Sequence, residues 1–209
     1  MAAPGVRGQR LTDAAPVGGQ NAKHMIRGER VFLRAAERSD LPLFVNWLND
    51  AETASFITAR APMSMAMEEQ WFEKVLVDHG TSRWHFVICL VESGQPIGTI
   101  GLFELDLATG SAGMGIVIGE KQLWGQGYGT DAHNALLDFA FGSLRLERVW
   151  LEVNDDNFRA KRSYEKCGFK FEGTERHAMF RAGKHHDLDL MSILRDEWSA
   201  LDRKRSWDY

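Results

Sequence analysis

Glycines alternate in one short stretch of this 209-residue chain, which reads Trp124-Gly125-Gln126-Gly127-Tyr128-Gly129-Thr130. The stretch follows a predicted strand and precedes residues with the apolar spacing of an amphipathic helix. Glycine lets a ligand approach the backbone closely, and the first turn of a helix offers unpaired N–H groups and a partial positive charge. The pattern therefore indicates a loop that holds phosphate oxygens.

Two common phosphate-binding motifs do not fit this loop. A Walker loop needs a lysine directly after its last glycine, and none follows here. A dinucleotide fingerprint spaces its glycines as Gly-x-Gly-x-x-Gly inside a parallel βαβ unit, whereas these strands are predicted to be antiparallel and the spacing is Gly-x-Gly-x-Gly. For the loop taken alone, a glycine-rich turn without a ligand stays the alternative.

A second motif follows downstream and reads Asn157-Phe158-Arg159-Ala160-Lys161-Arg162-Ser163-Tyr164-Glu165-Lys166-Cys167-Gly168-Phe169. Together, the two motifs resemble the pyrophosphate loop and the Asn…Tyr-Glu-Lys-x-Gly-Phe segment of the GNAT superfamily of acyl-CoA N-acyltransferases. The resemblance spans about residues 29–198 and is strongest to the RimJ/RimL-type branch, whose members often carry Trp-Gly-x-Gly-Tyr and a closing Glu-Trp, here Glu197-Trp198. Trp124 departs from the wider superfamily, which often has Gln or Arg there, so no side-chain contact to phosphate is expected from it.

The resemblance implies a fold and a co-substrate. The fold is mixed α/β (α+β), a single GNAT-type domain whose mostly antiparallel sheet is splayed at its centre and flanked by about four helices. The co-substrate is acetyl-CoA, whose pantetheine arm would lie between strands at 116–118 and 149–153. Asn157 would reach that arm, although capping of its helix is an alternative role. The residues implied to contact the cofactor are Val117, Ile118, Gln126, Gly127, Tyr128, Gly129, Thr130, Asn157, Arg159 and Tyr164.

Tyr164 is the candidate general acid. It shares a helix face with Ala160 and Cys167, so its ring is predicted to point toward the sheet. Matched to the family motif, it would protonate the departing thiolate, because a phenol with a pKa of about 10 keeps its proton at neutral pH. A core tyrosine bonded to a carbonyl is the alternative.

The general base is less clearly marked. Glu104 is the candidate in the catalytic pair with Tyr164, because it ends a strand near the expected entrance of the acceptor. Asp106 and His85 are further candidates, and a water chain is an alternative to all three. A lysine-like amine, with a pKa of about 10.4, needs more help to lose its proton than a protein α-amine near 7.7–8.0.

Composition excludes several classes of protein. A net charge of -4 argues against nucleic-acid binding, and no apolar run approaches the ~20 residues that span a bilayer. Without a signal peptide the chain is predicted to be cytoplasmic, with Cys89 and Cys167 as buried, reduced thiols. His185 and His186 are adjacent on a predicted strand and would face opposite sides, so no metal site is expected.

Three segments are predicted along the chain. Residues 1–28 lack apolar periodicity and are expected to form a disordered leader, 29–198 the acetyltransferase domain, and 199–209 a polar C-terminal tail. Within the domain, two helices follow the first strand. The predicted later strands are at 84–91, 96–103, 112–118, 146–153, 169–173 and 187–194.

The sequence thus predicts acetyl transfer to a primary amine by direct attack in a ternary complex, in a monomer or homodimer. The acceptor is either a protein N-terminal α-amine or a small amine such as a polyamine or aminoglycoside, and Glu52, Glu104 and Asp106 would favour a polycation. The alternative is a non-catalytic acyl-CoA-binding regulatory module. The presence of both Asn157 and Tyr164 argues against it, because a pure binder has no use for a thiolate acid.

Overall fold

A single eight-stranded sheet organises the chain in the computed structural model, which describes residues 26–57 and 62–209. The strand order is β1-β2-β3-β4-β5-β6-β8-β7, and neighbours are antiparallel except for the parallel pair β5 and β6. The strands are β1 (Ile26–Arg27), β2 (Val31–Ala35), β3 (Trp84–Leu90), β4 (Pro96–Asp106), β5 (Ser111–Ile118), β6 (Arg148–Asn154), β7 (Lys170–Arg181) and β8 (Lys184–Leu194).

The sheet opens between β5 and β6. These two strands pair at Ser111↔Arg148, Ala112↔Val149 and Gly113↔Trp150. Beyond these pairs, β5 continues to Ile118 and β6 to Asn154 without further pairing to each other. The predicted central splay is therefore confirmed, and it leaves backbone N–H and C=O groups of β5 facing a gap.

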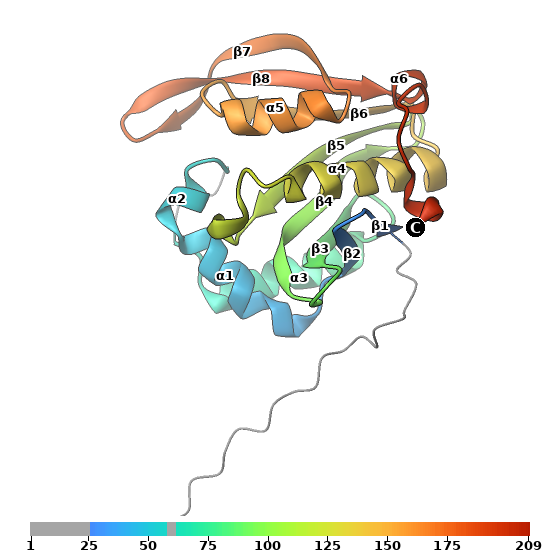
Figure 1. Cartoon of the computed structure of the whole chain (residues 1–209). Coiled ribbons are helices and arrows are strands. Elements are labelled where there is room, and N and C mark those ends of the chain that lie inside the picture. The colour runs from blue at the N-terminus through green and yellow to red at the C-terminus, as the bar shows by residue number, and fades with distance from the viewer. Residues whose placement is uncertain (1–25, 58–61) are drawn as a thin grey trace, which may run out of the picture.

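Helices cover both faces of the sheet. The four longer helices of the described ranges are α1 (Leu41–Asn49), α3 (Met65–Asp78), α4 (Tyr128–Asp138) and α5 (Phe158–Lys166), which agrees with the expected number. The shorter ones are α2 (Ala51–Ala54) and α6 (Arg195–Ser199). Figure 1 shows α1 and α3 together at one end of the molecule, with α4 and α5 nearer the other.

Alternation along the strands divides the core into two layers. Val31 and Leu33 of β2 pack with α4, whereas Phe32 between them packs with α1 and α3. In β3, Ile88 joins the first layer and Val87 the second. Because successive side chains of a strand point to opposite faces, α4 covers one face of the sheet while α1 and α3 cover the other.

The closing hairpin of β7 and β8 is longer than predicted. The sequence predicts strands only at 169–173 and 187–194, yet β7 runs to Arg181 and β8 begins at Lys184. Most side chains between 174 and 186 are exposed and polar, so these residues carry no apolar alternation. Figure 1 shows this hairpin along the top of the molecule.

Both ends of the predicted domain extend further than expected. Residues 1–25 of the predicted leader lie outside the described residues, but Ile26 is buried in β1, paired with β2. The expected polar tail packs against α4, where the buried carboxylate of Asp138 accepts hydrogen bonds from Trp198 Nε1 (3.0 Å), Arg203 Nη2 (2.6 Å) and the Ser206 amide (2.7 Å). A buried carboxylate requires such partners, which explains why this segment is held down. None of the described helices is long and apolar enough to cross a membrane.

Candidate active site

The glycine loop forms the N-terminus of α4. Gly125 and Gly127 have φ values of 74° and 90°, in the left-handed region that glycine adopts without strain. The first helical hydrogen bond runs from the Asp131 amide to the Gly127 carbonyl (3.0 Å). The amides before Asp131 therefore have no partner within the helix, and this is the geometry that favours phosphate oxygens.

The outer side of the loop is clamped by neighbouring side chains. Arg30 donates from Nη1 to the Gln126 carbonyl (2.6 Å), and its guanidinium lies 3.8 Å from the centre of the Tyr128 ring. Trp124 donates from Nε1 to the Ile118 carbonyl (2.7 Å), which fastens the loop to the end of β5. The sequence predicts no phosphate contact from the Trp124 side chain, and its structural role is this bond to β5.

The register of β5 decides which residues face the gap. The Gly119 amide donates to the Ile97 carbonyl on β4 (2.9 Å), and the Val117 carbonyl also lies against β4, at Gly98. Alternate residues of a strand direct their backbone groups to opposite sides, so Ile116 and Ile118 direct theirs into the gap. Val117 therefore cannot make the expected backbone contact there.

A cavity of about 1000 Å³ passes through the gap and joins the two faces of the sheet. Its volume is typical of sites that hold small ligands. Predicted site residues on its wall are Val117, Ile118, Gly127, Gly129, Thr130, Asn157, Arg159, Tyr164 and His85. Other predicted residues lie outside this wall, namely Glu52, Glu104, Asp106, Gln126 and Tyr128.

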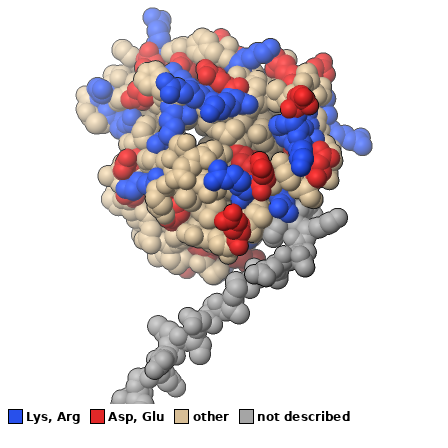
Figure 2. Space-filling view, viewed as in Figure 1, with Lys and Arg blue, Asp and Glu red and all other residues tan. Residues whose placement is uncertain are grey.

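Helix α5 brings Asn157 and several cations to the cavity. Asn157 accepts a hydrogen bond from the Ala160 amide at Oδ1 (3.2 Å), so its predicted capping role is confirmed. Arg159 lies with its guanidinium 4.0 Å from the centre of the Trp124 ring, beside the loop. Figure 2 shows basic side chains gathered over α5, whose Lys and Arg residues are Arg159, Lys161, Arg162 and Lys166. This positive rim favours an anionic ligand.

Tyr164 lies on the cavity wall with little exposure. Its ring packs against His133 (4.8 Å between ring centres) and Phe169 (5.8 Å). Among the described residues, its hydroxyl has no hydrogen-bond partner, so the alternative of a tyrosine tied to a carbonyl does not apply. Burial raises the pKa of Tyr164 well above its ordinary value, which keeps the phenol protonated at neutral pH.

The sequence analysis did not predict a cluster of polar side chains next to Tyr164, formed by Ser163, Thr130 and His133. Ser163 Oγ lies 2.8 Å from Thr130 Oγ1 and 3.4 Å from His133 Nδ1. Burial lowers the pKa of His133 to about 3, so this histidine is neutral. A signal was available, because His133 occupies an apolar-face position of α4 next to Ala132 and Leu136.

The carboxylate that lines the cavity is not one of those that the sequence analysis proposed as the general base. Glu104 is exposed, has a φ of 49° at an irregular end of β4, and does not line the cavity. Asp106 accepts hydrogen bonds from Thr109 and the Ala108 amide, in the turn after β4. Glu152 of β6 lines the cavity instead, and burial, with Glu175 and Glu104 nearby, raises its pKa. The sequence prediction missed Glu152, although it lies on the strand expected to form the wall.

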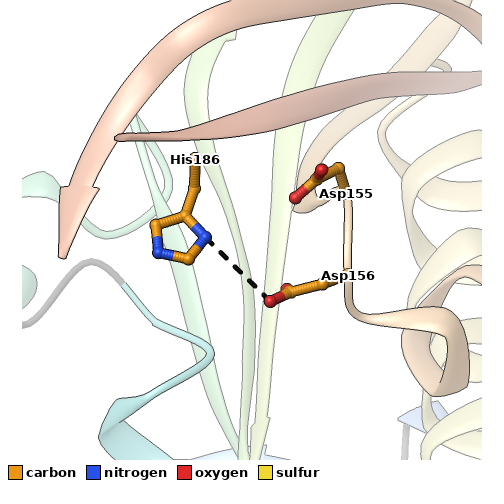
Figure 3. A group of neighbouring side chains, drawn as sticks. All are labelled: Asp155, Asp156 and His186. Carbon is orange, nitrogen blue, oxygen red and sulfur yellow. Dashed lines mark ion pairs between the residues drawn. The ribbon is translucent and has the colours of Figure 1, made fainter. Parts of the chain in front are cut away.

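The two adjacent histidines lie as predicted, on opposite sides of β8. His185 is exposed and stacks on His177 (5.0 Å between ring centres), whereas His186 is buried. His186 Nδ1 lies 4.0 Å from Asp156 Oδ2, and Asp155 completes a group whose nearest ligand atoms lie within 4.8 Å of one another. Figure 3 shows that the other ring nitrogen of His186 points away from both carboxylates.

Known proteins are similar to this chain in sequence and in fold. The family described as "Acetyltransferase (GNAT) domain" matches residues 30–170. Spermidine N(1)-acetyltransferase of Vibrio cholerae is 30% identical over 168 residues, which cover 79% of this chain and 94% of that protein. Aminoglycoside N(6')-acetyltransferase type 1 of Klebsiella pneumoniae is 25% identical, with 70% and 77% covered. The crystal structure of the V. cholerae spermidine enzyme with CoA and spermine has a TM-score of 0.75 at 29% identity, with 81% and 98% covered.

The matched region contains the glycine loop, Asn157, Tyr164 and the splayed strands that form the cavity. The sequence match, the fold and the site geometry therefore agree on the chemistry. The chain is an N-acetyltransferase that uses acetyl-CoA, and it belongs to the GNAT acetyltransferase family.

Proposed function

We propose that this enzyme acetylates a primary amine of a small molecule by direct attack within a ternary complex. One observation carries the proposal: a single cavity joins the glycine loop, Tyr164 and Glu152 through the gap in the sheet. Donor and acceptor can then meet from opposite faces without a covalent enzyme intermediate. The names of the V. cholerae and K. pneumoniae relatives, which refer to small amines, support this class of acceptor. Trp124 and Glu197-Trp198 support placement on the RimJ/RimL-like branch.

The proposed donor site uses mainly backbone groups. Amides of the loop and first turn of α4 hold the pyrophosphate, and Ile116 and Ile118 pair with the pantetheine arm as an added strand would. In this proposal Asn157 contacts the arm and Arg159 binds a phosphate at the rim, which is supported by the position of both residues on the cavity wall. The amides proposed to hold the pyrophosphate belong to Gln126, Gly127, Tyr128, Gly129 and Thr130.

The proposed chemistry divides proton transfer between two residues. Glu152 accepts a proton from the acceptor nitrogen, and the N–C bond forms as the C–S bond breaks. Tyr164 gives its hydroxyl proton to the departing sulfur, and solvent restores that proton afterwards. A β5 amide in the gap, at Ile116 or Ile118, stabilises the oxygen of the attacked carbonyl.

The test is release of free thiol from acetyl-CoA in the presence of an amine panel. The panel contains polyamines, aminoglycosides and peptides with free N-termini. We expect turnover with small amines and none with the peptides. Turnover with the peptides alone would contradict the proposed acceptor class, and acetyl-CoA binding without any turnover would favour the regulatory module.

Two further predictions concern the state of the protein. We expect a cytoplasmic enzyme that is a monomer or a homodimer. The spermidine N-acetyltransferase of V. cholerae has been solved as a dodecamer, with a TM-score of 0.71 at 28% identity, and with 83% of this chain and 98% of that one covered. Light scattering on the purified chain will distinguish these assemblies.

A further inference from the structure

Aromatic rings line the end of the cavity that lies under α1 and α3. Phe44 and Trp71 meet edge to face at 6.3 Å between ring centres, and Trp71 meets His85 edge to face at 4.7 Å. Trp47 stacks on Phe44 at 5.9 Å. All four rings belong to the cavity wall. Electron-rich ring faces of this kind attract alkylammonium groups.

The sheet leaves space beside these rings. Gly101 of β4 pairs with Gly115 of β5, and both glycines line the cavity. Gly101 is also paired with His85 of β3. A methyl group added at Gly115 would meet only Phe103 Cε1, at 3.6 Å, so the floor is open there to a narrow, flexible chain, whereas at Gly101 the Trp84 carbonyl, 2.4 Å from such a methyl, fills the space.

Glu68 lies at the same end and is buried without a partner. Its side chain lines the cavity although Glu68 is only 2% exposed. It precedes Trp71 by three residues on α3, so the two share a helix face. Among the described residues, the Glu68 carboxylate makes no hydrogen bond or ion pair, and Arg83, which also lines the cavity, does not contact it.

An unpaired buried carboxylate is unfavourable in a folded protein. Burial removes the charged form of Glu68 from water and so raises the pKa of this carboxyl. The start of α3 offers partial positive charge but no direct partner. A ligand cation would supply that partner and also fill the space between the rings.

His85 does not oppose a cation at this position. Burial, together with Arg83 and His79, lowers the pKa of His85 to about 4, so the imidazole is neutral at physiological pH. Its Nε2 atom is buried and has no hydrogen-bond partner within the part of the chain that the structure describes. The Glu68 end of the cavity thus has the Glu68 carboxylate, the Arg83 guanidinium, one neutral imidazole and three larger aromatic rings.

We propose that Glu68 binds a second ammonium group of the acceptor, between Phe44, Trp71 and His85. The acceptor is then an aliphatic di- or polyamine, with one amine acetylated beside Tyr164 and Glu152 and its alkyl chain lying over Gly115. This inference rests on the proposed small-amine function and names its substrate class. A monoamine of the same length lacks the group that Glu68 recognises.

Steady-state kinetics with two amines of equal chain length test the proposal. Putrescine carries the second ammonium and n-butylamine does not. We expect Glu68→Gln to raise the KM for putrescine about 10- to 100-fold and to leave n-butylamine kinetics unchanged, because loss of one partner of a buried charge pair is costly. The kcat for putrescine should change little, since Glu68 does not touch the reacting atoms. An unchanged KM for putrescine would overturn the proposal.

The matched control is Glu69→Gln, which neutralises the neighbouring, exposed carboxylate of α3. Glu69→Gln should leave the KM and kcat for both amines unchanged. If Glu68→Gln fails to fold, Trp71→Leu provides a second variant, because it removes a ring but keeps apolar bulk. Trp71→Leu should raise the KM for putrescine several-fold more than that for n-butylamine, and equal effects on both amines would contradict the proposal.

Equilibrium binding separates this inference from the proposed function. Putrescine binding is measured by calorimetry on the wild-type chain and on Glu68→Gln, with CoA present. If no amine is turned over but Glu68→Gln still weakens putrescine binding at least tenfold, the inference stands and the proposed function fails. Equal binding by both proteins would overturn the inference, whether or not the wild type is active.

Discussion

The two ends of the cavity differ in how their polar groups are satisfied. At the donor end, Trp124 is bonded to the Ile118 carbonyl, Asn157 to the Ala160 amide, and Thr130 to Ser163. At the acceptor end, the Glu68 carboxylate and the Nε2 atom of His85 have no partner among the described residues.

This difference separates a preorganised site from one that needs its ligand. The donor end presents free backbone amides on a framework in which Trp124, Asn157 and Thr130 are already paired, so little ordering of the loop is required when a cofactor binds. Among the described residues, His133 Nε2 and the side-chain amide of Asn154 are unpaired at this end. The acceptor end carries the cost of unpaired buried groups until a complementary ligand arrives. We therefore expect changes at the donor end to alter cofactor binding, and changes at the acceptor end to alter substrate selectivity and pH response.

The largest effect should come from Tyr164, which lies where the two ends meet. Tyr164→Phe removes the hydroxyl and keeps the ring that packs on His133 and Phe169. General acid catalysis is worth about 10²- to 10⁴-fold, so we expect kcat to fall by that factor while the Kd for CoA changes little. Thiol-release assays at saturating amine measure this change.

Tyr209→Phe is the control for this substitution, because Tyr209 lies away from the site cavity, over Arg27 and near Lys204. It should leave kcat unchanged. A Tyr164→Phe enzyme with wild-type kcat, under conditions where the chemical step limits the rate, would remove Tyr164 as the acid.

Glu152→Gln should have the next largest effect. We expect kcat/KM for the amine to fall about 10- to 100-fold at pH 7. Because the pKa of Glu152 is raised, its basic form appears only as pH rises through that value, so wild-type activity should increase over this range. The variant should lose this limb of the pH profile. A larger loss in Glu104→Gln would instead return the role to Glu104.

Lowering the pH should reduce the free energy of unfolding of the protein because of His85. The folded protein holds His85 neutral down to about pH 4, whereas the unfolded chain protonates it near 6.5. The unfolded state therefore binds more protons between these values, and stability falls as pH drops, by about 2 kcal/mol at pH 5. Glu68 has the opposite effect on stability. Its pKa is raised in the folded state, so the folded state binds a proton at a higher pH than the unfolded state does, and this contribution stabilises the fold as pH falls.

Urea unfolding of His85→Gln at pH 7.5 and pH 5 isolates the histidine contribution. The variant should lose less stability than the wild type between the two conditions. His177→Gln, at an exposed position of β7, should behave as the wild type does. Equal losses in His85→Gln and the wild type would show that the imidazole is not held neutral.

The same contrast explains what the sequence could predict. The glycine loop, the Asn157 cap and the position of Tyr164 are local patterns, each contained within one turn of backbone or one helix. The acceptor end joins Phe44, Glu68 and His85, which lie on three different elements and meet only through packing.

The pairing register of β5 with β4 could not be predicted from the sequence either. Whether Val117 or its neighbours face the gap depends on which residues of β5 pair with β4, and Ile97↔Gly119 hydrogen bonding settles it. The alternation of apolar residues fixes the side-chain faces of a strand, but it does not say which backbone groups are already used. Glu104 is a related case, because the irregular end of β4, where Glu104 is exposed and outside the cavity wall, could not be foreseen from the alternation.

The smallest effect tests whether the donor end depends on backbone shape. Gly127→Ala places a methyl group 3.7 Å from Arg30 Nη1, without a clash, but at a φ of 90° it should cost about 1–2 kcal/mol of stability. Gly183→Ala carries similar strain at a φ of 79°, at the tip of the β7–β8 hairpin where no atom lies near the new methyl. Only Gly127→Ala should raise the KM for acetyl-CoA, by about tenfold, because only there does relief of strain move phosphate-binding amides. Equal KM values in the two variants would mean that the loop tolerates distortion and that the donor end is less preorganised than its hydrogen bonds indicate.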